Sequence, residues 1–407
     1  MSLSSFEIWE VFLEHGQDYG RRGVDTLYRL LVNNARLTWF DVDLTNICNL
    51  TCNHCFYHDN YSESSEPALS AEHLEEVIRQ SLQAQIKILT FSGKEPTLSK
   101  HFRLAVQSAR RAREEYAPAA KVGLITNGLT LPLNLPFLEK EPPDFIDISI
   151  DGWEFQNLIR SNTRDRVVAN LQQAKQTLKS TRVGTSTVVR NDNWPDILTM
   201  IEHLAGLSNY FYFEPVVAAV DKNIDSLSEE NLVAFVTNLR KLAQRFRQHD
   251  IRFSILLNGD QTLPLFYRGL LEPEDIEEDE LNSLYIRQQF GKAQIDFILR
   301  IVPEYYWRAA RLSYDGYWLG TCDLLQAPNY REVAAGNFVQ TPDLQQLFKR
   351  ALGRDSLFYQ SLQEPFLYPC GHTPREQQYC LNCFSTRIVR MIHRRYGRHL
   401  TALQVAA

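Results

Sequence analysis

Short apolar runs of strand length alternate with helical periodicity over much of the chain. Strand-like segments cover residues 37–44, 86–91, 121–126, 145–150, 183–189 and 210–213, and helical patterns cover 70–84, 101–115, 165–179, 195–204 and 229–249. Strands that alternate with helices form a parallel sheet with right-handed crossovers. These six units are fewer than a closed eight-stranded barrel requires. The pattern therefore predicts an α/β fold with a partial, TIM-like (β/α)6 barrel.

Three other regions do not follow this alternation. Residues 1–36 have a helical pattern without a readable motif, and the chain from about residue 301 is irregular. Residues 264–283 are dense in Glu and Asp, most of all at 272–280. Such an acidic run is typical of a solvated linker face, and we prefer that interpretation to a metal site.

Composition limits the classes of partner. At 407 residues the chain exceeds one typical core, and its net charge of −6 gives no preference for a polyanion, so nucleic acid is not indicated. No stretch of about 18 consecutive apolar residues occurs, so no membrane span is predicted. The first ten residues carry acidic side chains in place of a basic region and an apolar run. We expect a cytoplasmic protein.

The seven cysteines fall into two groups, Cys48, Cys52 and Cys55 after the first strand, and Cys322, Cys370, Cys380 and Cys383 near the end. An odd number without a secretion signal favours metal binding over disulfides. Three thiolates spaced C-x3-C-x2-C on one loop can hold three corners of a 4Fe-4S cluster and leave one iron open. Zinc bound by the same thiols and His58 is the alternative.

Polar motifs follow the next three strands. Residues 93–97, Asn127 and Asp151 each come directly after an apolar run, as the first cysteine loop does. Sites in parallel α/β sheets form on the loops beyond the carboxyl ends of the strands. We therefore expect all four segments at one rim of the barrel.

This order of motifs resembles that of the radical S-adenosylmethionine (radical SAM) superfamily, whose signature is C-x3-C-x-φ-C with φ aromatic. Here His54 occupies the φ position and Phe56 follows the last cysteine. The resemblance implies that the open iron binds the amino and carboxylate groups of S-adenosylmethionine. One electron then cleaves its sulfonium to a 5′-deoxyadenosyl radical, which abstracts a substrate hydrogen. The protein would supply position and exclude water.

The resemblance also implies contacts with S-adenosylmethionine. Ser92-Gly-Lys-Glu-Pro matches the family's Gly-Gly-Glu-Pro stretch, which binds the methionyl ammonium. Lys94 replaces the second glycine, and lysine would be strained if that position needed positive φ. Ser149 is a candidate ribose ligand, and Arg160 a candidate for the methionyl carboxylate or, equally, a surface salt-bridge residue. The full set of implied cofactor-binding residues is His54, Phe56, Gly93, Lys94, Glu95, Pro96, Thr126, Asn127, Ser149, Asp151, Arg160, Ser186 and Val189.

The C-terminal part resembles the SPASM or twitch extension, through residues 313–322, 335–337 and 380–383. A full SPASM domain would have a cysteine at position 341, where this chain has threonine. Four remaining thiolates imply one auxiliary 4Fe-4S cluster that transfers electrons, and a structural zinc held by Cys322, Cys370, Cys380 and Cys383 stays open as the alternative. The expected division is 1–36 helical segment, 37–256 radical SAM partial barrel, 257–300 acidic linker or insertion, and 301–407 auxiliary iron–sulfur domain.

Relatives with such extensions often modify ribosomally made precursor peptides, so the resemblance implies an oxidoreductase acting as a peptide maturase. The alternative is oxidation or rearrangement of a small metabolite such as an amino sugar or nucleoside, and a third class is a zinc-stabilised binding module without catalysis. The expected partners are the substrate, an external one-electron reductant of flavodoxin or ferredoxin type and a substrate-presenting accessory protein. Because every cysteine belongs to one of the two sets, no other thiol is available to return a hydrogen.

Overall fold

The computed structural model describes most of the barrel and part of the C-terminal region. The described residues are 25, 28–29, 31–52, 54–55, 57, 67–215, 227–279, 283–300, 308–320, 324–325 and 329–360. Those between 25 and 33 are helical, as expected for this segment. Phe56, His58, Cys322, Cys370, Cys380 and Cys383 lie outside the described residues.

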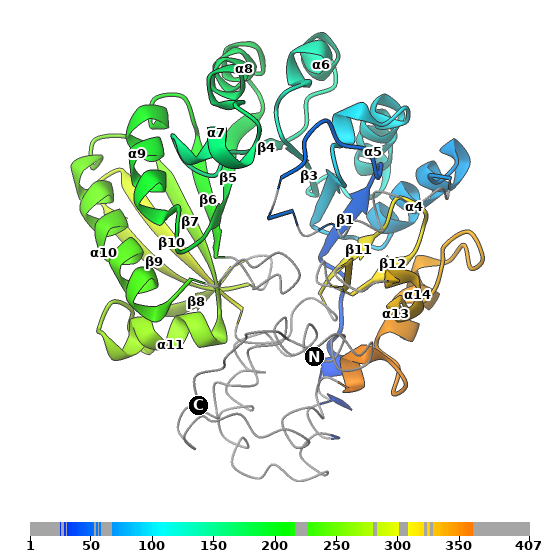
Figure 1. Ribbon diagram of the computed structural model, residues 1–407. Coiled ribbons are helices and arrows are strands. Elements are labelled where there is room, and N and C mark those ends of the chain that lie inside the picture. Colours follow the sequence, from blue (N-terminus) through cyan, green and yellow to red (C-terminus); the bar gives the residue numbers. More distant parts are fainter. Residues whose placement is uncertain are drawn as a thin grey trace.

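One curled sheet runs through the molecule (Figure 1). Its order is β12-β11-β1-β2-β3-β4-β5-β6-β7-β10-β9-β8. The strands are β1 (Trp39–Asp43), β2 (Ile88–Ser92), β3 (Lys121–Thr126), β4 (Phe145–Ser149), β5 (Arg182–Val189), β6 (Tyr210–Pro215), β7 (Arg252–Asn258), β8 (Ile276–Glu278), β9 (Leu284–Phe290), β10 (Ala293–Arg300), β11 (Ala309–Leu312) and β12 (Trp318–Leu319). This is a partial, TIM-like barrel, and the predicted fold class is confirmed.

The six predicted strands correspond to β1–β6, which pair in parallel in sequence order. The sheet continues beyond both ends of this series. On one side β7 and β10 add in parallel, and β9 and β8 follow antiparallel. On the other side β11, from the C-terminal part of the chain, pairs in parallel with β1, so that the first strand has neighbours on both edges.

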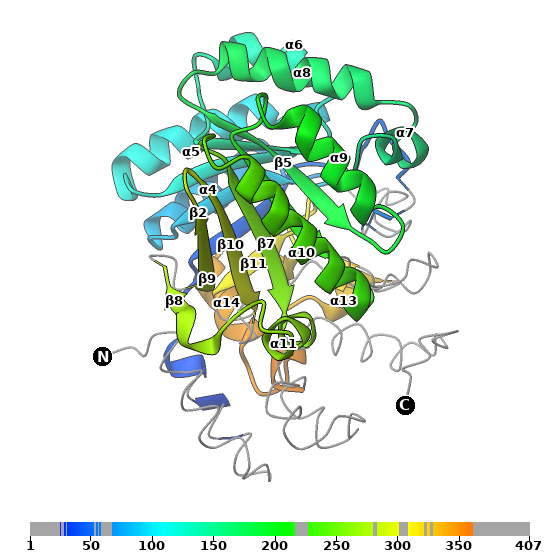
Figure 2. The same ribbon diagram turned by 90° about the vertical axis from the view of Figure 1, so that its left-hand side faces the viewer.

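Helices cover the convex face of the sheet (Figure 2). They are α4 (Ala71–Gln83), α5 (Phe102–Tyr116), α6 (Leu131–Leu138), α7 (Phe155–Ile159), α8 (Arg164–Thr177), α9 (Trp194–Leu204), α10 (Glu229–Arg245), α11 (Gly259–Tyr267), α13 (Tyr330–Val333) and α14 (Leu344–Ala351), with 3-10 turns η1 (Pro96–Leu98) and η3 (Pro273–Asp275). Ser70 and Ser228 cap α4 and α10 by accepting a backbone hydrogen bond in the first turn.

Strand alternation separates an apolar convex face from a polar concave face. Phe211 and Phe213 of β6 are fully buried, and the Phe213 ring packs edge-on against Phe235 of α10. Tyr210 and Tyr212 alternate with them and are only half-buried. Since side chains alternate across a strand, Tyr210 and Tyr212 lie on the concave face, where a partial barrel places its ligands.

The segment expected to be an acidic linker or insertion is built into the sheet. Residues 276–278 form β8, and β9 and β10 follow within residues 284–300. Asp296 of β10 pairs with Arg287 of β9, with Oδ1 to Nε at 2.7 Å. The hairpin of β9 and β10 was not predicted, because the acidic residues at 272–280 suggested a linker. The alternating pattern of these strands starts only after that acidic run. The domain boundaries themselves stay a prediction.

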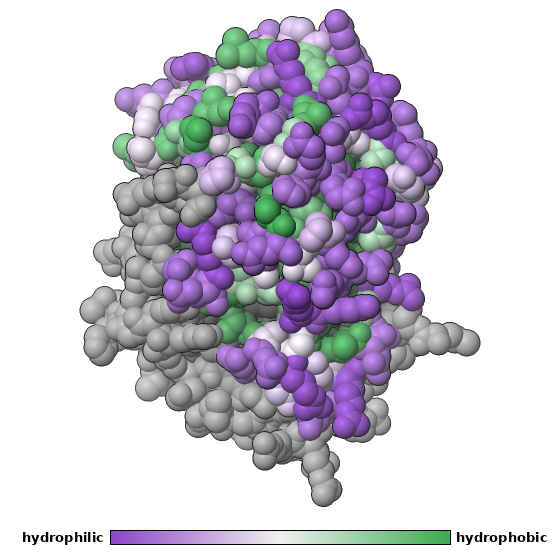
Figure 3. All heavy atoms as spheres, turned by 90° about the vertical axis from the view of Figure 1, so that its right-hand side faces the viewer, coloured by the Kyte–Doolittle hydropathy of each residue, from purple (hydrophilic) through white to green (hydrophobic). Residues whose placement is uncertain are grey.

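The face formed by α4, α5 and α14 is largely hydrophilic, with small separate apolar spots (Figure 3). This follows from the amphipathic helices, whose apolar residues pack inward. Among the described residues, no helix has the length and apolar character needed to cross a membrane.

Candidate functional site

The cysteine loop leaves β1 and is held against the end of β2 by main-chain hydrogen bonds. Leu44 N donates to Ser92 O at 3.0 Å, Lys94 N to Thr45 O at 3.2 Å and Glu95 N to Ile47 O at 3.0 Å. Gly93 has φ of 112°, and a Cβ there would meet Thr45 O at 2.8 Å. Only glycine fits this close approach of two backbones. Lys94 is not among the non-glycine residues with positive φ, so the departure from the family's second glycine causes no strain.

Glu95 joins the ends of β2 and β3. Its side chain is fully buried; Thr126 Oγ1 donates to Oε1 at 2.7 Å, and Asn127 N donates to Oε2 at 2.7 Å. Burial raises the pKa of Glu95, although these hydrogen bonds oppose the shift. Pro96 then begins η1. The carboxylate therefore has a structural role that the sequence did not reveal, and its contact with a ligand ammonium stays a prediction.

Cys48, Cys52 and Cys55 are half-buried on the loop and form no disulfide. The Cys48 sulfur accepts hydrogen bonds from Leu50 N at 3.4 Å and Asn127 Nδ2 at 3.7 Å. Burial raises the pKa of Cys48, and it raises the pKa of Cys52 to about 11 against the opposing effect of Arg160. Within the described parts of the chain, no three His, Cys, Asp or Glu side chains are grouped closely enough to hold a metal ion.

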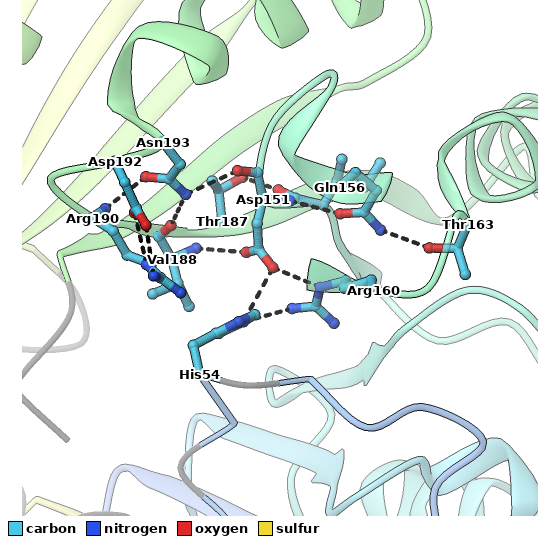
Figure 4. A network of polar contacts seen from close by, with 11 residues as sticks. His54, Asp151, Gln156, Arg160, Thr163, Thr187, Val188, Arg190, Asp192 and Asn193 are labelled. Carbon is cyan, nitrogen blue, oxygen red and sulfur yellow. Dashed lines mark hydrogen bonds and ion pairs between the residues drawn. The ribbon is translucent and has the colours of Figure 1, made fainter. Parts of the chain in front are cut away.

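Ionic contacts among Asp151, Arg160 and His54, here called the Asp151 tether, connect the middle of the cysteine loop with the end of β4 (Figure 4). Asp151 is fully buried, and its Oδ2 lies 2.6 Å from Arg160 Nε and 3.1 Å from His54 Nε2. Val188 N donates to the other oxygen at 3.0 Å. Burial opposes ionisation of Asp151, but the charges of Arg160 and His54 outweigh it and hold its pKa well below the usual range.

Arg160 therefore lies beside the cysteine loop, as its predicted contact with a ligand requires, but its guanidinium group is already paired with Asp151. Its Nη2 is 3.3 Å from His54 Nε2, and the side chain is about nine-tenths buried. The neighbouring Asp151 and Cys52 raise its pKa despite burial. His54 Nδ1, by contrast, is buried without a hydrogen-bond partner. The surface salt-bridge alternative for Arg160 is wrong, because both Arg160 and Asp151 are buried.

Among the remaining predicted residues, Ser149 and Ser186 lie opposite each other on β4 and β5 and are half-buried. Val189 is fully buried in the hydrophobic core, on the other face of β5. Alternation along the strand thus separates the Ser186 and Val189 side chains. A side-chain contact of Val189 with a ligand beside Ser186 is not supported.

These motifs lie together because parallel strands end at the same rim. A sequence model described as the Radical SAM superfamily matches residues 42–204, the segment that contains the cysteine loop and all the strand-end motifs. Residues 42–204 therefore form a radical SAM domain, which covers about two fifths of the chain. The match ends before β6, and it leaves the C-terminal cysteines outside.

The curated relatives of this radical SAM chain include GTP 3′,8-cyclases. The chain is 27% identical to a probable GTP 3′,8-cyclase of Thermoplasma volcanium over 164 residues, which are 40% of this chain and 48% of that protein. It is 25% identical to the GTP 3′,8-cyclase of a Synechocystis species over 171 residues, 41% of this chain and 50% of that protein. The chain thus spans about half the length of these relatives.

Solved structures are similar over nearly the whole radical SAM chain. SuiB of Streptococcus suis bound to its precursor peptide SuiA has a TM-score of 0.63 at 13% identity, over 90% of this chain and 74% of that one. The enzyme anSMEcpe with bound AdoMet has a TM-score of 0.51 at 16% identity, over 89% of this chain and 98% of that one. At these identities the similarity shows the fold.

The donor set fits the cluster that radical SAM proteins hold. Three thiols without a carboxylate ligand suit iron–sulfur chemistry, and the N–H groups directed at the Cys48 sulfur stabilise a thiolate. A bound metal would also offset the burial penalty that raises the pKa of Cys48 and Cys52. Sequence reasoning did not identify Asp43, Tyr57 and Arg311, which contact one another and Ser92 at the base of the same loop. Acidic residues at alternating positions 41 and 43 of an otherwise apolar strand were the available signal.

Proposed function

We propose that this radical SAM enzyme uses S-adenosylmethionine and a 4Fe-4S cluster held by Cys48, Cys52 and Cys55 to abstract a hydrogen from a ribosomally made precursor peptide. When bound, the two cofactors would supply a 5′-deoxyadenosyl radical. The observation that carries the choice of a peptide is the similarity to peptide-bound SuiB, which extends over 90% of the chain. The similarity to the GTP 3′,8-cyclases covers about 40%.

The residues of the chain have separate tasks in this proposal. Gly93 brings the backbone of the second strand end against the cysteine loop, and the tether of Asp151 to His54 holds the middle of that loop. Ser149 and Ser186 present hydroxyl groups on the concave face for the ribose. Glu95 and Asp151 are fully buried at the strand ends, so these two carboxylates support the loop without contact with water.

We further propose one auxiliary 4Fe-4S cluster on Cys322, Cys370, Cys380 and Cys383, which lie outside the described residues. The two motifs that resemble the SPASM or twitch extension pack together: Trp318 N donates to Gly336 O at 2.9 Å and Asn337 Nδ2 to Asp315 O at 3.0 Å. This supports a folded extension. About eight irons per chain are expected for two clusters, whereas about four irons and one zinc would overturn the auxiliary cluster.

The substrate is tested by supplying the reconstituted, reduced protein with S-adenosylmethionine and either GTP or a short peptide encoded beside its gene. We expect 5′-deoxyadenosine together with loss of hydrogen from the peptide, measured by mass spectrometry. Cyclised GTP would overturn the peptide proposal and favour the small-metabolite alternative, which the cyclase relatives support. If no 5′-deoxyadenosine forms under any condition, both enzyme proposals fail, and the zinc-stabilised binding module is favoured. A cytoplasmic location, an external one-electron reductant and a substrate-presenting protein are parts of the same proposal.

A further inference from the structure

The two ends of the cysteine loop meet at a buried hydrogen bond. Asp43 is the last residue of β1, directly before the loop, and Tyr57 follows the third cysteine by two positions. Tyr57 Oη donates to Asp43 Oδ1 at 3.1 Å, and both side chains are at most 5% exposed. This contact closes the segment that carries Cys48, Cys52 and Cys55 into a loop with a defined base.

Arg311 binds that base from the C-terminal part of the chain. Its Nη1 donates to Asp43 Oδ1 at 2.6 Å, to Tyr57 Oη at 2.9 Å and to Ser92 Oγ at 3.1 Å. Its Nη2 donates to Asp41 Oδ2 at 2.9 Å. One guanidinium group thus joins the loop entrance, the loop exit and the residue before Gly93.

The pairing of β11 with β1 fixes the position of this guanidinium group. β11 is parallel to β1, with Arg311 opposite Asp41. The side chain is 7% exposed, so its charge is compensated by Asp41 and Asp43 and not by water. A fork of several N–H donors is required to reach all these acceptors at once, which an ammonium group cannot do.

We propose that Arg311 is a positioning residue for the cluster-binding loop, so that the C-terminal region is part of the machinery that holds the three cysteines in place. Arg311 acts through Asp43 and Tyr57 and touches neither cluster nor substrate. The radical SAM family match ends at residue 204, and nothing in it assigns a role to this strand. This inference depends on the proposed function in one respect, namely that the loop holds a cluster.

The test compares the full-length chain with R311Q, R311K and Y57F, by hydrogen exchange of the backbone amides in residues 44–57 and by the rate of iron loss to a chelator. R311Q should speed both by about tenfold or more, because a buried charged hydrogen-bond network is lost. R311K should fall between R311Q and the native chain. Y57F, which removes one hydroxyl and is the safer variant for folding, should give a smaller change in the same direction.

R287Q is the matched control, because it removes another arginine–aspartate pair between strands, that of Arg287 and Asp296 at 2.7 Å. It should leave exchange in residues 44–57 unchanged. Native exchange rates in both R311Q and Y57F, or an equal increase in R287Q, would overturn the proposal. If the native chain binds no iron, the proposed function fails, while the exchange comparison still decides whether Arg311 holds the loop.

Discussion

The two ends of the half-barrel differ in what fills them. At the amino ends of the strands, aromatic rings occupy positions left open by glycine: the Phe145 ring lies where a Cβ of Gly123 would be, within 2.0 Å, and the Tyr210 ring lies 2.4 Å from a Cβ built on Gly184. At the carboxyl ends, charged side chains hold loops that carry thiols. One end is closely packed, and the other is the proposed ligand site.

Two carboxylates four positions apart show this difference most directly. Asp147 of β4 binds the Tyr210 hydroxyl, and burial raises its pKa to about 6. Asp151, just past the same strand, is fully buried, yet Arg160 and His54 hold its pKa well below normal. Asp147 is half-buried and its pKa is lowered only weakly by Tyr210 and Arg182, whereas Asp151 accepts hydrogen bonds from Arg160 and His54 directly. At the carboxyl end, direct ion pairs hold the carboxylate of Asp151 in its charged form.

The largest predicted effect concerns the thiols. Replacing Cys48, Cys52 and Cys55 together with alanine should remove the first set of irons and abolish formation of 5′-deoxyadenosine, because no other thiols lie on this loop. The paired variant C380A/C383A should retain cleavage of S-adenosylmethionine but stop product formation. Iron analysis and chromatography measure both. Cleavage by the triple variant would show that the cluster is held elsewhere.

The contribution of the Asp151 tether to stability is tested by D151N. This change leaves Arg160 buried without its charge partner and should lower the free energy of unfolding by about 3 kcal/mol, measured in urea. E75Q is the control, because Glu75 lies 2.9 Å from Arg111 and both side chains of this pair are exposed. It should cost at most about 1 kcal/mol. Equal costs for the two variants would contradict the distinction between buried and exposed pairs.

The packed amino end is tested by G184A. The added methyl group would overlap the Tyr210 ring and should destabilise the protein by about 1–3 kcal/mol. G206A is the control, since a Cβ at Gly206 meets nothing within 4 Å. Thermal unfolding of the two variants gives the comparison. A neutral G184A would mean that Tyr210 moves freely and that this end is not closely packed.

The smallest effect is a pH dependence from Asp147. Its pKa is about 6 when folded and about 3.9 when unfolded, so the folded state binds more protons between these values. Its contribution therefore makes stability fall as pH rises from about 4 to about 6. D147N should be more stable than the native chain at pH 7, by about 1 kcal/mol after allowing for partial exposure, and similar at pH 4. Parallel stability curves for the two proteins would exclude this assignment.

Much of the barrel could be predicted from sequence, because each of β1–β6 is a short apolar run bounded by polar turns. The 70–84 and 229–249 patterns likewise correspond to α4 and α10. Helix α6 was missed, since Pro132 and Pro136 interrupt its pattern. The pairing of β11 with β1 could not be predicted, because it depends on residues about 270 positions apart and not on local periodicity. For the same reason, the contacts of Arg311 with Asp41 and Asp43 could not be predicted from the sequence.

The position of β11 also has a consequence for biosynthesis. Asp43 leaves the ribosome 268 residues before Arg311, and at about 5–20 residues per second this separation corresponds to tens of seconds of translation. During that time β1 has an uncovered edge, and the base of its loop lacks its guanidinium. Iron delivered to the nascent chain would meet an incomplete binding loop. Insertion of the proposed cluster is therefore expected to follow synthesis of β11.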